Sequence, residues 1–279
     1  MTATAAHTSL SPRLVEAITG SAADIARLLG PGADSAAPIP GALWSVGESA
    51  AHLALANELM ADLARGRQRP YGDGTPGGLA EANARSLADY GERDPAVLGA
   101  AIARHAHAFI EAADQRPEPE PGPGTAAAEA VLTPLGPMDL EVLAAYLLTH
   151  MLGHGYDLAR ALGRPHMISA ERVGLALPFL LTAMPRVLDA SAAAGHRARY
   201  RIGLRGGPRF TVTIADGAVQ VSPGLPDRTD CTISCDPVTF FLMALGRRGP
   251  WSAPARGQVL AWGRRPWLAP GFTHYFRAP

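Results

Sequence analysis

The segment from Asp139 to Pro165 limits most strongly what this chain can fold into. Asp139 is a good helix N-cap, and Gly163 followed by Pro165 is a typical helix end, so the pattern predicts one long helix. Steps of four, three, four and four residues place five side chains on one face of it: Leu143, Leu147, His150, His154 and Leu158. Because the other members are leucines, we expect this face to point into a helical bundle.

Two histidines on a buried face need partners, because burying a polar group is costly unless it is hydrogen-bonded. A single buried histidine is usually a hydrogen-bonded core residue. Two histidines at i and i+4 can instead share one metal ion, and His-x-x-x-His on a helix is a recurring metal-binding arrangement. His150 and His154 therefore predict a metal site, which needs a further ligand from elsewhere in the chain.

The helix expected over 45–65 supplies that ligand. Ser45 and Glu48 form a capping-box pattern at its start, and His52 follows at a core-facing position. Taken alone, His52 is more often a hydrogen-bonded core histidine, but beside His150 and His154 it is the candidate third ligand. For Trp44, just before the helix, two alternatives are open: it lines the pocket of these histidines, or it packs as a hydrophobic staple at the helix start.

The hydrophobic period changes near residue 195, and this divides the chain. Before that point, helical periodicity predicts an all-α bundle with helices over 12–30, 45–65, 79–113 (broken at 94–95), 139–163 and 169–194. After it, alternation in twos predicts strands over 200–204, 210–214, 219–221, 230–234 and 258–262, with a helix over 236–246. We therefore expect two domains: a helical bundle over 1–195 and a small α+β domain over 196–279.

Composition excludes several function classes. The 25 basic side chains are all arginine, so a Schiff-base lysine and a lysine-containing phosphate loop are excluded. Basic and acidic residues balance, which predicts no nucleic-acid partner. No apolar run approaches the roughly 20 residues of a membrane span, and the first residues lack the pattern of a signal peptide. We therefore expect a cytoplasmic protein with no membrane partner.

Cys231 and Cys235 are the only cysteines, and both fall near one predicted strand. A step of four residues along a strand separates them by about 13 Å. A disulfide needs Cα atoms within roughly 7 Å, so we expect two free, reduced thiols.

Three segments carry a resemblance to a known family. Residues 44–52 (WSVGESAAH) and 154–165 (HGYDLARALGRP) resemble helix segments of the DinB-like, mycothiol-dependent maleylpyruvate isomerase family. Residues 230–237 (DCTISCDP), through to 257–263 (GQVLAWG), are similar to the sterol-carrier-like domain that often follows in these proteins. The resemblance implies a DinB-like four-helix bundle with a C-terminal sterol-carrier-like α+β domain.

The resemblance also implies a site. In this family three helix-borne ligands hold a divalent metal, usually zinc, and a small thiol such as mycothiol becomes the nucleophile. The isomerases commonly have His, Glu and His as ligands, whereas His150 stands here at the glutamate position. Three neutral imidazoles leave the ion its full charge, which lowers the pKa of a bound thiol further. Imidazole ligands favour zinc or nickel over magnesium.

Several alternatives stay open at this stage. Asp157 is either an orienting partner of a ligand imidazole or an ordinary polar residue near a helix end. The expected function is S-transfer or isomerisation of an electrophilic small molecule. The alternatives are a specialised-metabolite biosynthetic enzyme that uses the metal as a Lewis acid without a thiol, and a non-catalytic small-molecule-binding protein. The arginines that would contact an anionic substrate, or lie on the surface instead, are Arg201, Arg205, Arg247 and Arg248.

Overall fold

A computed structural model describes residues 10–73, 76–116, 130–224, 228–249 and 256–277. The chain forms two compact units, Met1–Met167 and Ile168–Pro279.

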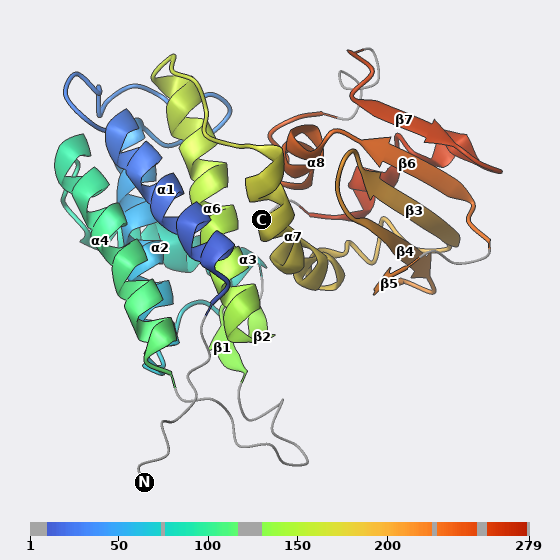
Figure 1. Ribbon diagram of the computed structural model, residues 1–279, viewed down its shortest axis with the longest axis horizontal. Helices are drawn as coiled ribbons and strands as arrows, with labels where there is room; N and C mark the ends of the chain where they lie inside the picture. Colours follow the sequence, from blue (N-terminus) through green and yellow to red (C-terminus); the bar gives the residue numbers. More distant parts are fainter. Residues whose placement is uncertain (1–9, 74–75, 117–129, 225–227, 250–255, 278–279) are drawn as a thin grey trace, which may run out of the picture. The chain divides into compact units, whose positions relative to one another are not determined.

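The first unit is a helical bundle (Figure 1). Its helices are α1 (Pro12–Leu28), α2 (Val46–Ala64), α3 (Pro76–Asp89), α4 (Pro95–Asp114) and α6 (Leu140–Ala161). Helices α1 and α2 each pack against both α4 and α6, so four of the helices form a bundle in which α1 and α2 are diagonal. The short α3 packs beside α2. The expected all-α first region is confirmed.

Local capping explains where the two central helices begin. The Ser45 hydroxyl accepts a hydrogen bond from the Glu48 amide, and the Glu48 carboxylate accepts one from the Ser45 amide, which completes the capping box of α2. Asp139 caps α6 by accepting a hydrogen bond from the Val142 amide at 2.7 Å. These caps position both helices to within about a turn of the ranges that the sequence predicts.

Small residues let the helices approach closely. A Cβ at Gly99 of α4 would lie 3.1 Å from the Ala26 Cα of α1, and one at Gly155 of α6 would lie 3.2 Å from Ile25. Gly155 directly follows His154, so the packing of α6 on α1 fixes the depth of that histidine in the bundle.

A two-stranded hairpin, β1 (Val131–Thr133) and β2 (Gly136–Met138), precedes α6. The sequence reading did not predict this hairpin, because three-residue strands contain too little alternation to be recognised.

The second unit is a five-stranded sheet with helices. Its strands are β3 (Ala198–Leu204), β4 (Arg209–Ala215), β5 (Ala218–Pro223), β6 (Cys231–Cys235) and β7 (Val259–Trp262), in the order β5-β4-β3-β6-β7. Its helices are α7 (Ala170–Ala183), η1 (Met184–Val187), α8 (Pro237–Ala244), η3 (Pro266–Leu268) and η4 (Phe272–Tyr275). Only the β3–β6 pair is parallel. The expected α+β architecture is confirmed.

One face of this sheet forms the core of the unit. Phe210 of β4 contacts Phe240 of α8 with ring centroids 6.0 Å apart. Tyr200 of β3 contacts Phe272 of η4 at 4.9 Å. Both Tyr200 and Phe241 are fully buried, so α8 and the C-terminal segment lie against this apolar face.

The segment after residue 167 differs from the expected pattern in two ways. The predicted helix over 169–194 is too long: α7 ends at Ala183, and a 3₁₀ turn containing Pro185 follows it, since proline cannot donate the next helical hydrogen bond. The compact units divide after Met167, whereas the predicted domain boundary lies at 195. The reason is that α7 packs on α8 and therefore groups with the sheet.

Among the helices that the structure describes, none is both long and apolar enough to cross a membrane.

Cys231 and Cys235 are free and buried on β6, as the sequence predicts. Burial raises the pKa of Cys231 to about 11 and that of Cys235 to about 12, so both remain thiols near neutral pH.

We predict that iodoacetamide at pH 8 leaves the native protein unmodified and labels two sites after unfolding. Rapid labelling of either cysteine in the native protein, measured by mass spectrometry, would contradict this burial.

Asp189 ties the C-terminal segment to the rest of its unit. Its carboxylate accepts hydrogen bonds from Ser191, the Arg277 guanidinium and the Ala192 amide, and these lower its pKa well below the ordinary value. Since the folded pKa is depressed, the stabilisation is present above the ordinary aspartate pKa and is lost as pH falls through the folded one. We predict that Asp189→Asn lowers the midpoint of thermal unfolding at pH 7, measured by circular dichroism, and that the difference in midpoint between variant and wild type becomes smaller below about pH 4. A difference in midpoint that does not change with pH would show that the charge of Asp189 is not the source of the stabilisation.

Candidate metal centre

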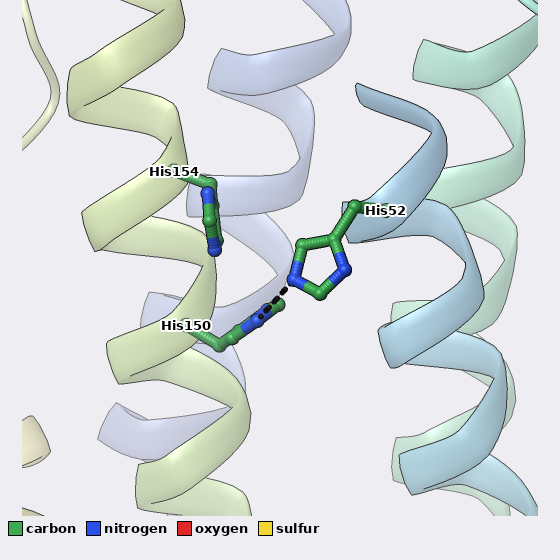
Figure 2. A group of neighbouring side chains, drawn as sticks. All are labelled: His52, His150 and His154. Carbon is green, nitrogen blue, oxygen red and sulfur yellow. Dashed lines mark hydrogen bonds between the residues drawn. The ribbon is translucent and has the colours of Figure 1, made fainter. Parts of the chain in front are cut away.

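Three histidines from two helices converge inside the first unit. His52 projects from α2 and is 5% exposed, whereas His150 and His154 lie one turn apart on α6 and are partly exposed. Figure 2 shows their rings directed toward the space between the two helices. The structure thus brings together the three side chains that the sequence reading selected as metal ligands.

The ring nitrogens lie at distances suited to one ion. The Nε2 atoms of His52 and His150 are 3.1 Å apart, and one nitrogen from each of the three rings falls within 4.8 Å of the others. Ligand nitrogens at 2.0–2.1 Å from a tetrahedral ion are separated by about 3.3 Å. In the described part of the chain, no other group of three His, Cys, Asp or Glu side chains is arranged in this way. The residues present therefore fit a divalent metal.

Burial keeps His52 in the form that binds metal. Desolvation lowers its pKa from the ordinary 6.5 to about 4, because an apolar environment disfavours the charged imidazolium. At neutral pH the ring is therefore uncharged and carries a lone pair on one nitrogen.

Trp44 lies against two of the three histidines. Its ring is 4.8 Å from that of His52 and 6.2 Å from that of His154, with an interplanar angle of 27° to the latter. A tight loop holds it there, since the Ile39 amide donates to the Trp44 carbonyl and Pro38 pairs with Ser45. Of the two alternatives for Trp44, these contacts favour packing beside the histidines over a staple at the helix start.

Asp157 lies one turn beyond His154 on α6. Its Oδ2 is 3.8 Å from His154 Nδ1, and the two side chains are only 13% and 16% exposed. At this distance the contact is electrostatic rather than a direct hydrogen bond. The carboxylate therefore faces the nitrogen of His154 that a metal bound at Nε2 would leave open, which supports the orienting role over an ordinary polar position.

The sequence reading missed Tyr146, which is one turn before His150 and has its ring 6.3 Å away at 87°. Burial, with a smaller effect of Tyr71, raises the pKa of Tyr146 to about 12. Its spacing of four residues from His150 on the same helix is the signal that could have found it.

The other candidates in the chain have different surroundings. In the second unit, Arg205 donates to the Gly257 and Gln258 carbonyls, Arg247 to the Leu245 carbonyl, and Arg248 to Thr239 and Gln258. These three arginines stabilise their own unit.

The fold and site define a class of protein: a four-helix bundle with a candidate three-histidine metal centre, joined to an α+β unit. Residues 15–159 match the family model described as the mycothiol maleylpyruvate isomerase N-terminal domain, and residues 181–260 match the SCP-2 sterol transfer family. Because the first match covers more than half of its 279 residues, the chain belongs to the mycothiol maleylpyruvate isomerase N-terminal domain family. No curated protein sequence matches the chain significantly.

Solved structures with a related arrangement include a mycothiol-dependent maleylpyruvate isomerase, with 15% identity over 89% of this chain and 91% of that chain and a TM-score of 0.48. A mutant of such an isomerase has 13% identity, the same coverage and a TM-score of 0.49. An inverting sec-alkylsulfatase from a Pseudomonas species has 15% identity and a TM-score of 0.34, and the match covers 50% of this chain but only 25% of the sulfatase. Likeness at this level does not define an activity.

The position of Asp157 leads to a prediction about metal affinity. We expect Asp157→Asn to weaken zinc binding by roughly tenfold, because the charged partner of His154 is lost. Competition with a chromophoric chelator measures this. Glu141→Gln is the matched control, because it also removes one negative charge from α6 but at an exposed position in the first turn. It should leave the zinc affinity unchanged. Equal affinities in wild type and Asp157→Asn would exclude the orienting role.

Proposed function

We propose that this protein is a metal-dependent enzyme in which a small thiol attacks an electrophilic carbon. The family to which the chain belongs suggests that this thiol is mycothiol. The product is an isomer of the substrate or a thiol conjugate. The single observation that carries the proposal is the convergence of three imidazoles between α2 and α6, in a chain that belongs to this family.

His52, His150 and His154 would hold the ion, and three protein ligands are typical of catalytic rather than structural zinc sites. When bound, a divalent ion such as zinc or nickel would act as a Lewis acid that lowers the pKa of a coordinated thiol or water toward neutrality. The all-imidazole ligand set adds no negative charge. A thiol should therefore ionise there at a lower pH than beside a carboxylate ligand.

The residues around the triad support attack by a thiolate. Trp44 places an apolar ring beside His52 and His154. Asp157 lies 3.8 Å from His154 and would orient its ring. The leucines of α6 that share the face, Leu143 and Leu147, are fully buried. A poorly hydrated thiolate is the stronger nucleophile for carbon.

Electron bookkeeping distinguishes the two outcomes. In isomerisation, the thiolate adds to the β-carbon of an alkene that is conjugated with a carbonyl group. The alkene electron pair then forms a double bond to the carbonyl carbon, and the carbonyl π pair moves to oxygen. Rotation about the resulting single bond and expulsion of the same thiolate give the other geometric isomer, with no net change of atoms. In S-transfer, the new carbon–sulfur bond forms as a leaving group departs with the electron pair of its bond.

Binding of the thiol can be tested without knowing the substrate. We predict that adding mycothiol to cobalt-loaded protein produces a sulfur-to-cobalt charge-transfer band in the near ultraviolet. His150→Ala should lose the band, and His150→Glu should retain it at higher pH, since the glutamate reduces the charge of the site. Turnover of maleylpyruvate with and without mycothiol is measured in parallel.

Cobalt binding without any thiol band, together with no thiol-dependent turnover, would contradict the proposal. Turnover by the metal-loaded protein without thiol would instead identify an enzyme that uses the metal as a Lewis acid. If the protein neither bound metal nor turned over substrate, the remaining interpretation would be a non-catalytic binding protein.

A further inference from the structure

The overall neutrality of the chain hides a strong segregation of charge. The second unit, Ile168–Pro279, contains 14 arginines and 6 acidic residues, a formal excess of eight positive charges. The first unit contains 11 arginines and 19 acidic residues, an equal excess of negative charge. The balance that predicted no electrostatic footprint therefore holds for the total and not for the second unit.

Part of this positive charge lies on one face of the five-stranded sheet. Strand register places fourteen residues on the face opposite the apolar core: Ala218, Gln220, Ser222, Ala215, Thr213, Thr211, Arg209, Arg199, Arg201, Gly203, Thr232, Ser234, Leu260 and Trp262. None of them is acidic, and three are arginines. Only Thr211 and Thr232 are buried, whereas α8 and η4 contact the other face. We call this surface the basic sheet face.

The arginines of the basic sheet face lie across its centre. Arg199 and Arg209 are exposed, and Arg201 is partly exposed. A Cβ at Gly203 would touch Arg209 Cγ at 3.5 Å, so the stem of Arg209 extends over β3 where no side chain stands in its way. The centre of the face thus presents two exposed arginine side chains, Arg199 and Arg209.

Its edge is apolar. On the edge strand β7, Leu260 and Trp262 are both 52% exposed, and two residues apart on a strand they point the same way. Leu260 and Trp262 therefore form a pair of exposed apolar side chains at the edge of the basic sheet face.

We propose that the basic sheet face docks on the surface of a lipid bilayer with anionic headgroups. Charge complementarity supports this occupant, since the arginines can contact lipid phosphates while the second unit as a whole is attracted to negative charge. Tryptophan and leucine at the rim match the region between headgroups and acyl chains, where amphipathic aromatic rings are favoured. Docking of this kind is peripheral and needs no membrane-spanning segment.

Single-stranded nucleic acid fits this surface less well. Binding to a sheet face relies on aromatic side chains on which bases stack, and the central strands here present arginine, threonine, serine and glycine instead. The one aromatic residue on the face, Trp262, is at its edge and next to a leucine.

Co-sedimentation of the full chain with vesicles tests the proposal. Vesicles of phosphatidylcholine with about 30% phosphatidylglycerol should bind the protein, pure phosphatidylcholine should not, and binding should weaken as salt is raised. The double variant Arg199→Glu with Arg209→Glu should reduce binding at least about tenfold. Arg13→Glu with Arg104→Glu, two exposed positions of the first unit, makes the same change in net charge and should leave binding intact.

A second measurement does not depend on the charge variants. Lipids brominated near the headgroup should quench the tryptophan fluorescence of bound wild type, and Trp262→Ser should reduce that quenching. A fluorescent single-stranded oligonucleotide is the competing probe. Three outcomes would overturn the proposal. They are a failure of the protein to bind anionic vesicles at low salt, an equal loss of vesicle binding in the two double variants, and binding of the protein to the oligonucleotide but not to the vesicles.

Discussion

The candidate site depends on three imidazoles that converge within an apolar bundle. Burying a polar group is costly unless it is satisfied. Here His52 is buried with its Nε2 atom 3.1 Å from that of His150, while His150 and His154 are partly exposed on a helix whose neighbouring leucines are fully buried. Burial has already driven His52 into its neutral form. A shared cation would accept a lone pair from each of the three rings at once, which makes this convergence a candidate metal site.

Local signals in the sequence made the site predictable. The capping residues Ser45 and Asp139 start α2 and α6, and the period of four residues then places His52, His150 and His154 on inward faces. The sequence alone could not decide between the alternatives for Trp44 and Asp157, because both alternatives for each residue agree with the same spacing. The observations that separate them are the contacts of Trp44 with two histidine rings and the distance between Asp157 and His154, which periodicity does not contain.

The second unit shows where such signals weaken. Alternation predicted all five strands, whereas the end of α7 was missed because Pro178 is accommodated inside the helix and Pro185 is not. The charge of this unit was also missed, because the total over 279 residues is zero. Charge became informative only when the compact units and the strand register were known, since these decide which arginines share a surface.

Elemental analysis of the purified protein, beside His150→Ala, tests the central claim most directly. Three converging imidazoles predict about one divalent ion per chain in wild type, and its loss in a variant that keeps its helical circular dichroism. Wild type that holds no metal even after zinc and nickel supplementation would contradict the claim. So would a full equivalent of metal retained in His150→Ala, because the ion would then be bound elsewhere.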